Sequence, residues 1–184
     1  MSPNEDQDKQ IIDDAKDLVI DSIAETMDLY GVTRSTGTLY GTMYFEEDMT
    51  LDQMRTKLEM SKPSMSTGVK KLQDYEIVKK SFKRGSRKNI YQAEKDFFRF
   101  FNKFFTHKWE REVKLNLEAI ADAQKMLDEV LHSESSSHEA REEALKVYRQ
   151  LENSKPYYYW LESLVASIRS GRIFESVPVE NKKE

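Results

Sequence analysis

Hydrophobic residues recur at intervals of three and four along much of the chain, which is the period of an amphipathic helix. The first stripe, in residues 10–30, comprises Ile11, Ile12, Ala15, Leu18, Val19, Ile23, Met27 and Tyr30. Gly31 follows it, at the position where a helix commonly ends, and the polar residues 1–9 are expected to form a frayed acidic tail. A second helix is expected over residues 35–45, with Leu39, Tyr40, Met43 and Tyr44 on or near one face.

Two shorter helices are predicted next, each with a polar residue placed to cap it. Thr50 precedes a helix over residues 51–58, and a hydroxyl at this position accepts a hydrogen bond from a free backbone amide. Ser61 precedes a helix that runs to about Tyr75, and Pro63 is tolerated in its first turn. Met65, Val69 and Leu72 then form the inward face of this second helix.

The pattern changes to that of strands after this helix. The β-branched Ile77 and Val78 open a strand over residues 77–82, a turn follows at 84–86, and residues 89–91 return. The order helix, short break, helix and β-hairpin is that of a winged helix-turn-helix.

Helical patterning returns after Glu94 and continues to about Leu131, without glycine or proline. A polar linker follows at residues 132–137, then a short charged helix over 137–153, and Pro156 is expected to open a last helix that Gly171 stops. The predicted fold is therefore mainly α with a small β-hairpin wing. Its expected parts are N-terminal helices in 1–45, the winged helix-turn-helix in 46–94, long C-terminal helices in 95–174, and a loose tail in 175–184.

Charge is strongly segregated in this chain, although the net charge is only −4. Residues 62–88 hold nine basic and two acidic residues, so the rest of the chain is acidic. Because salt screens charges over about 8 Å, a DNA phosphate would respond to the basic patch more than to the total. The patch coincides with the second helix and the hairpin of the predicted winged domain, which favours DNA binding over an ordinary solvated surface.

A helix that enters the major groove needs polar and basic side chains on its outward face. The candidate DNA-binding residues on the second helix are Ser61, Lys62, Ser64, Ser66, Thr67, Lys70 and Lys71, and those on the hairpin are Lys83, Arg84, Arg87 and Lys88. Gly68 indicates close approach of a backbone, either of DNA or of a packing helix. The flanking helices carry apolar stripes that a small winged domain cannot cover alone, so a homodimer is expected, with packing inside one chain as the alternative.

Six of the nine phenylalanines lie between Phe97 and Phe105, and Trp109 follows. Most of these rings are expected to be core. Aromatic walls also bind quaternary ammonium ions, with about 0.5–2 kcal/mol for each ring, so a ligand pocket is a second interpretation. Its candidate residues are Tyr40, Tyr44, Phe97, Phe101 and Trp109.

Other functional classes find little support in the sequence. Cysteine is absent, which excludes disulfides and thiol chemistry and fits a cytoplasmic protein. The three histidines have no partner at metal-binding spacing, and no glycine-rich phosphate loop or transmembrane segment is present. No catalytic residue, metal site or cofactor is therefore expected, and the chain is predicted not to be an enzyme.

The layout resembles the MarR-like winged-helix repressors and, within them, the GbsR-type branch. The resemblance is carried by residues 22–31 (SIAETMDLYG), 37–45 (GTLYGTMYF), 51–54 (LDQM), 60–68 (MSKPSMSTG) and 83–88 (KRGSRK). It implies a homodimer that binds double-stranded operator DNA and represses genes for choline or glycine betaine uptake or synthesis.

The resemblance also implies an aromatic cage for choline or glycine betaine as the effector. Tyr44, Phe101 and Trp109 are the first cage candidates, followed by Tyr40 and Phe97. Two alternatives remain open: a ligand-independent repressor of the same genes, and a winged-helix protein-interaction module that does not bind DNA.

Overall fold

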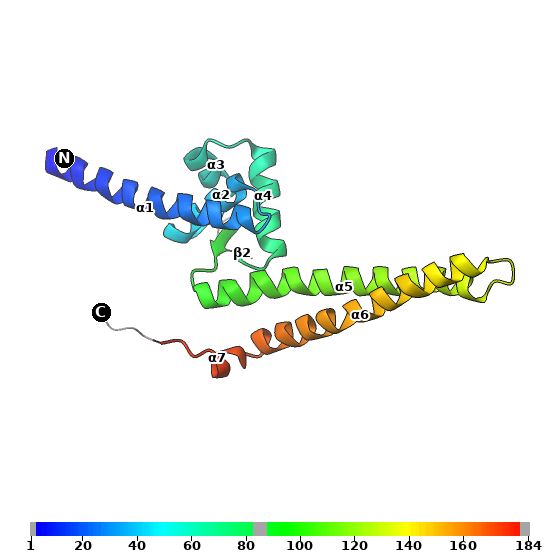
Figure 1. The fold of residues 1–184 in the computed structure, drawn as a ribbon. Helices are drawn as coiled ribbons and strands as arrows, with labels where there is room; N and C mark the ends of the chain where they lie inside the picture. Colours follow the sequence, from blue (N-terminus) through cyan, green and yellow to red (C-terminus); the bar gives the residue numbers. More distant parts are fainter. Residues whose placement is uncertain (1–2, 83–87, 181–184) are drawn as a thin grey trace. The chain divides into compact units, whose positions relative to one another are not determined.

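The computed structural model describes residues 3–82 and 88–180 (Figure 1). The chain divides into two compact units, Met1–Lys103 and Phe104–Glu184, and the division falls inside helix α5 (Phe97–His132). The structure is mainly helical with one small antiparallel sheet, which confirms the predicted fold class. Among the described residues, no helix is long and apolar enough to cross a membrane.

Helix α1 (Pro3–Leu29) begins near the start of the chain, so the prediction of a frayed tail was wrong for residues 3–9. Glu5 and Asp6 lie in its first turn, where negative charge is favourable beside the free amide groups of a helix. The predicted end of the helix is confirmed: Gly31 has a positive φ of 75°, and the Val32 amide donates to the Met27 carbonyl.

Helix α2 (Arg34–Phe45) packs against α1 at two glycines. A Cβ atom added to Gly37 would lie 2.7 Å from the Cα atom of Ala24, and one added to Gly41 would lie 3.1 Å from the Cα atom of Ile20. The two backbones therefore approach each other as closely as the absence of side chains allows.

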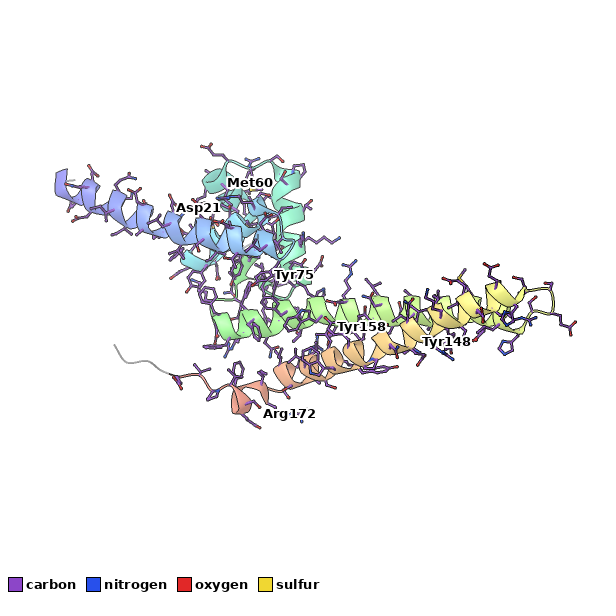
Figure 2. The ribbon with its side chains drawn as sticks, in the orientation of Figure 1. Asp21, Met60, Tyr75, Tyr148, Tyr158 and Arg172 are labelled. Atoms are coloured by element: carbon purple, nitrogen blue, oxygen red, sulfur yellow. The ribbon has the colours of Figure 1, made fainter. Side chains whose placement is uncertain are left out.

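Helices α3 (Leu51–Leu58) and α4 (Lys62–Asp74) have the predicted caps. The Thr50 hydroxyl accepts from the Gln53 amide at 3.3 Å, and the Gln53 side chain accepts from the Thr50 amide at 2.8 Å, which makes a complete capping box. The Ser61 hydroxyl accepts from the Ser64 amide at 3.3 Å. Met60, which precedes α4, and Tyr75, which follows its last residue, are labelled in Figure 2.

The sheet has three strands in the order β1 (Met49–Thr50), β3 (Ile90–Ala93) and β2 (Val78–Ser81). Both pairings are antiparallel, with Met49 opposite Tyr91 and Val78 opposite Ala93. The sequence predicted β2 and β3 but not β1, because a strand of two residues has no period to detect. The sheet and the helices of this unit enclose a set of fully buried side chains, which includes Val32, Leu39, Tyr40, Met43, Met54, Met65, Val69, Leu72 and Ile77.

The C-terminal unit pairs the rest of α5 with α6 (His138–Arg169) as an antiparallel hairpin, on which Figure 2 labels Tyr148 and Tyr158. Gln124 donates to Glu152 at 2.6 Å, and Arg169 donates to Glu110 at 2.6 Å. The short polar stretch before α6 ends at Ser137, whose hydroxyl accepts from the Ala140 amide.

The prediction that Pro156 opens a separate helix was wrong, because Pro156 lies inside α6. Proline removes one backbone hydrogen bond from a helix interior. Here Glu152 contacts α5 before the proline, and Tyr157 and Arg169 contact it afterwards, so tertiary contacts hold the helix on both sides.

The end of the chain agrees partly with the expected loose tail. Gly171, with a positive φ of 78°, follows the end of α6 as predicted. A short helix α7 (Ile173–Ser176) then includes the first two residues of the expected tail. Residues 177–180 form no helix or strand, and 181–184 lie outside the described residues.

Candidate nucleic-acid interface and aromatic cluster

Helix α4 separates an apolar inner face from a polar outer face. Met65, Val69 and Leu72 are at most 2% exposed, as the sequence predicted. The exposed candidate residues of this segment are Ser61, Lys62, Ser64, Ser66, Thr67 and Lys70. Gly68 is buried against α2, where an added Cβ atom would meet the side chains of Leu39 and Thr36, so the packing helix explains this glycine.

The candidate residues of α4 differ in what their side chains contact. The hydroxyls of Ser61 and Ser64 lie 2.9 Å apart at the helix N-terminus, so both belong to the cap. Lys71 is half-buried, and its Nζ donates to the carbonyl of Gly31 at 3.2 Å. The Lys71 ammonium therefore ties α4 to the end of α1, whereas the exposed Lys70 remains a candidate for phosphate contact.

The hairpin candidates Lys83, Arg84 and Arg87 lie outside the described residues. Lys88 is described and exposed, and its Nζ lies 3.1 Å from Oδ2 of Asp52 on α3. The hydrogen bond from Lys88 and its positive charge lower the pKa of Asp52 below its ordinary value. This acidic neighbour of the basic surface was missed by the sequence analysis, since residues far apart along the chain come together there.

Lys79 and Lys80 on β2 are also exposed, and they add to the basic surface of the N-terminal unit. Both belong to the basic segment 62–88 but were not among the predicted DNA contacts. Their positions on a strand of the wing place them among the side chains that a phosphate backbone could meet.

The N-terminal unit also contains a continuous group of aromatic rings from α2 and the start of α5. The rings of Tyr44 and Phe97 have centroids 5.1 Å apart, those of Phe97 and Phe100 are 6.5 Å apart, and those of Phe100 and Tyr40 are 5.1 Å apart. Such distances are typical of favourable ring pairs. The candidate cage residues Tyr40, Tyr44 and Phe97 therefore belong to one chain of ring contacts. Phe100, which was not among the predicted cage residues, lies between Phe97 and Tyr40 in that chain.

The aromatic candidates differ in how far they are enclosed. Tyr40 is only 1% exposed, and its hydroxyl donates to the backbone carbonyl of Glu94 at 2.6 Å. Burial, followed by the negative charge of Glu94, raises the pKa of Tyr40 well above its ordinary value, so this hydroxyl remains a donor. Phe97 is 50% exposed, and Tyr44 and Phe101 are half-buried.

Trp109 lies in the C-terminal unit, where its ring is 5.4 Å from that of Phe105. Both rings are half-buried on α5. The ring contacts described for Trp109 therefore belong to the packing of its own unit, and its role in a cage stays a prediction.

A shielded ion pair accompanies the aromatic cluster of the N-terminal unit. Nζ of Lys103 lies 2.5 Å from Oε2 of Glu94, and the two side chains are 20% and 14% exposed. Burial on its own raises the pKa of Glu94, but hydrogen bonds from Lys103 and from the Asp96 amide, together with nearby positive charges, bring it below its ordinary value. This pair could not be predicted from the sequence, because the start of α5 lies between the two residues.

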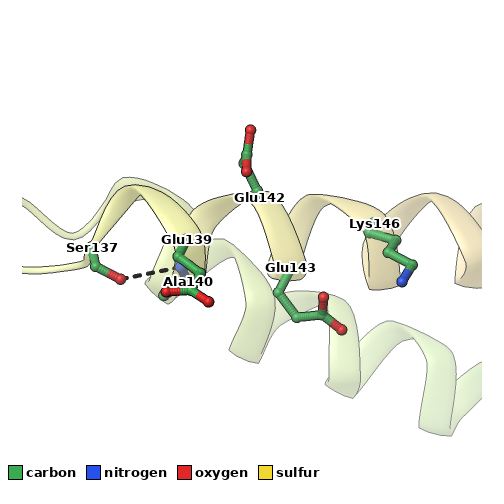
Figure 3. A pocket seen from close by; sticks show the side chains of 6 residues that line it. All are labelled: Ser137, Glu139, Ala140, Glu142, Glu143 and Lys146. Carbon is green, nitrogen blue, oxygen red and sulfur yellow. Dashed lines mark hydrogen bonds between the residues drawn. The ribbon is translucent and has the colours of Figure 1, made fainter.

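Figure 3 shows a surface pocket at the start of α6, and its lining is polar rather than aromatic. It is lined by Ser137, Glu139, Ala140, Glu142, Glu143 and Lys146. In the part of the chain that is described, no group of three or more metal-ligating side chains could hold a metal ion. The aromatic cluster remains the better candidate for an organic cation.

Comparisons with known proteins are consistent across the two units. Residues 97–175 match the family model described as the GbsR family transcriptional regulator, C-terminal helical hairpin. The chain is 61% identical over 171 residues to the HTH-type transcriptional repressor GbsR of Bacillus subtilis (strain 168), covering 93% of this chain and 95% of that protein.

More distant relatives extend over nearly the same length. The HTH-type transcriptional repressor OpcR of Bacillus subtilis (strain 168) is 30% identical and covers 91% of each chain. The putative HTH-type transcriptional regulator YvaV of the same organism is 32% identical and covers 91% of this chain and 95% of its own. A crystal structure of a transcriptional regulator matches with a TM-score of 0.59 at 16% identity, over 88% of this chain and 99% of the other, which supports the fold alone.

Proposed function

Because this chain belongs to the GbsR family of transcriptional regulators, we propose that it is a DNA-binding repressor in which α4 is the recognition helix. The relatives GbsR and OpcR are transcriptional repressors, which confirms the prediction that the chain is not an enzyme.

The orientation of α4 is the observation that carries the proposed DNA contact. Its apolar residues are buried, and Ser66, Thr67 and Lys70 are exposed together. Hydroxyl side chains can bond to several base edges, and lysine contacts phosphate, so this face suits the major groove. Lys79 and Lys80 extend the positive surface along β2.

The operator is proposed to be read by a homodimer. On α1, Ile11, Ile12 and Leu18 are 55–75% exposed, which leaves an apolar face for a second copy. A two-fold dimer places two recognition helices on successive turns of a palindromic site. The target genes are proposed to be those for choline or glycine betaine uptake or synthesis, as the family resemblance implies.

The effector is proposed to be a small quaternary ammonium compound, with choline as the first candidate. The half-exposed pair Tyr44 and Phe97 offers two ring faces in the N-terminal unit, and Phe101 follows one turn after Phe97. Desolvated cation–π contacts give about 2 kcal/mol for each ring. The enclosure of Tyr40 favours the alternative, a ligand-independent repressor, because an enclosed ring with a satisfied hydroxyl is explained by packing alone.

The test is binding of the full chain to promoter DNA of a choline-uptake gene, measured by fluorescence anisotropy with and without millimolar choline. We expect specific binding that choline weakens, and loss of this response in Tyr44→Ala and in Trp109→Ala. Affinity is expected to fall steeply with salt, and Lys70→Ala is expected to reduce the slope of log K against log salt by about 1.

Each outcome of this experiment separates one part of the proposal. Binding that ignores choline would support the ligand-independent repressor and assign the rings to the core. Affinity that is equal for promoter and random DNA would contradict the proposed target genes. Affinity that is nearly independent of salt would contradict the proposed operator contact and favour the protein-interaction module.

A further inference from the structure

We infer that Glu94 supplies the anionic group of the cation-binding site and that the Lys103 ammonium holds the position taken by the ligand's ammonium group. This inference rests on the proposed function, since it concerns how a quaternary ammonium effector is selected. It adds to the aromatic rings a charged residue that the family resemblance does not supply.

The Glu94 carboxylate lies in a shielded position. Its side chain is 14% exposed, and Oε2 is paired with Lys103 while Oε1 accepts from the Asp96 amide at 3.4 Å. The backbone carbonyl of Glu94 accepts from the buried Tyr40 hydroxyl at 2.6 Å. The Asp96 amide and the Tyr40 hydroxyl therefore hold Glu94 in addition to the lysine, and its negative charge is largely shielded from water.

The ion pair also adjoins the aromatic cluster through Tyr40 and the helix face of Phe100. Lys103 lies three residues after Phe100 on α5, and residues three apart share one face of a helix. The ring of Phe100 contacts that of Tyr40 and neighbours that of Phe97. Lys103 therefore shares a helix face with Phe100, and the carboxylate with which it pairs belongs to the residue whose backbone carbonyl Tyr40 contacts.

A quaternary ammonium group has no N–H to donate, so it is recognised by ring faces and by a nearby negative charge. Ring faces already favour a cation over a neutral molecule of the same shape, and a carboxylate strengthens that preference. Because burying a carboxylate without a partner is costly, the lysine side chain, which is long and flexible, serves as an exchangeable internal partner.

This arrangement predicts opposite effects for the two members of the pair. Glu94→Gln removes the attraction and is expected to weaken choline binding by about tenfold or more. Lys103→Met keeps the length of the side chain and removes the competing charge, so it is expected to tighten choline binding by roughly threefold. A pair that only stabilises the fold would weaken binding in both variants.

The experiment is isothermal titration calorimetry of the full chain with choline chloride and with 3,3-dimethylbutan-1-ol, a neutral molecule of the same shape. The unmodified chain is expected to prefer choline, and Glu94→Gln is expected to reduce that preference by about tenfold, because the cation–π contribution of the rings remains. Glu152→Gln and Lys155→Met provide a matched control, because they break a Glu–Lys pair of the C-terminal unit. Circular dichroism melting verifies that each variant is folded.

The outcomes distinguish this inference from the proposed function. If the unmodified chain does not bind choline, the proposed effector is wrong and this inference falls with it. If the chain binds choline and Glu94→Gln binds it equally well, the inference alone is wrong. Should Glu94→Gln fail to fold, Lys103→Met decides: tighter binding supports the inference, and unchanged or weaker binding overturns it.

Discussion

The two units of this chain bury their side chains to very different extents. In the N-terminal unit, large residues such as Met54 and Leu72 are fully enclosed, and even Tyr40 is only 1% exposed. In the C-terminal unit, Tyr159 and Trp160 on α6 are 52% and 58% exposed. The difference follows from geometry, since helices packed with a sheet can surround a side chain, whereas two helices meet along only one stripe.

The buried residues of the hairpin show this single stripe. They include Val113, Ile120, Leu161, Val165 and Ile168. The aromatic side chains on the other faces of α6 have no such enclosure, and exposed apolar patches of this kind mark interaction surfaces. The N-terminal unit is thus expected to owe its stability to its own core, and the hairpin to depend more on association.

The largest effect that would test this contrast is loss of a core side chain. Leu72→Ala is expected to reduce the free energy of unfolding by about 2–5 kcal/mol, because α4 cannot collapse around the cavity. Trp160→Ala is expected to reduce it by about 0.5 kcal/mol, because the ring is already exposed. Urea denaturation measures both values, and analytical ultracentrifugation detects the effect of Trp160→Ala on self-association.

The contrast would be wrong if the two variants lost similar stability without any change in association. Leu145→Ala on α6 is a suitable control, since Leu145 is 39% exposed and belongs to the same helix as Trp160.

A smaller effect is expected at the glycines that pack α2. Gly37→Ala should reduce stability by about 1–3 kcal/mol, because the new Cβ atom meets the backbone of Ala24, which cannot move aside alone. Gly68→Ala should be nearly neutral, because Leu39 contacts the site with a movable methyl group and alanine gains about 1 kcal/mol of helix propensity. Thermal unfolding compares the two directly. Equal melting temperatures would show that α1 and α2 are less tightly fixed than their backbones indicate.

The smallest effect is a difference in acid sensitivity between two Glu–Lys pairs. A carboxyl whose folded pKa is lowered stabilises the fold above its unfolded pKa, and that stability is lost as the pH falls through the folded value. Glu94, in its shielded position, is expected to contribute about 1 kcal/mol at neutral pH. Hydrogen bonds from Lys155 and Gln124 lower the pKa of Glu152 as well, but its side chain is 46% exposed and is expected to contribute less.

The measurement is the melting temperature of Glu94→Gln and Glu152→Gln between pH 7 and pH 3. The deficit of Glu94→Gln relative to the unmodified chain should shrink as the pH falls below the unfolded pKa of about 4.5. A deficit that does not change with pH would show that the Glu94 charge adds nothing to stability.

Features that depend on a few adjacent residues could be predicted from the sequence. The caps at Thr50 and Ser61, the helix ends at Gly31 and Gly171, and the inward face of α4 all follow from local hydrogen bonding and helical period. The fold class could be predicted because these signals occur in the order of a winged helix.

Features that depend on distant residues could not be predicted. The pairing of β1 with β3 and the uninterrupted course of α6 through Pro156 are decided by partners elsewhere in the fold. The same holds for the ion pair of Glu94 with Lys103 and for the placement of Lys71 on Gly31. In the candidate site, residue types could therefore be selected from the sequence, but their contacts could not.

The bond from Lys71 to the Gly31 carbonyl has a consequence for engineering new operator preferences. Replacing the whole of α4 with that of a related repressor would also exchange Lys71, Gly68 and Met65, which pack the helix against the rest of the N-terminal unit. Exchanging only Ser66, Thr67 and Lys70 would change the exposed face that is proposed to contact DNA and leave the buried contacts of α4 intact. The exposed face of α4 can thus be exchanged while its inner face is kept, and Lys71 belongs to the inner face.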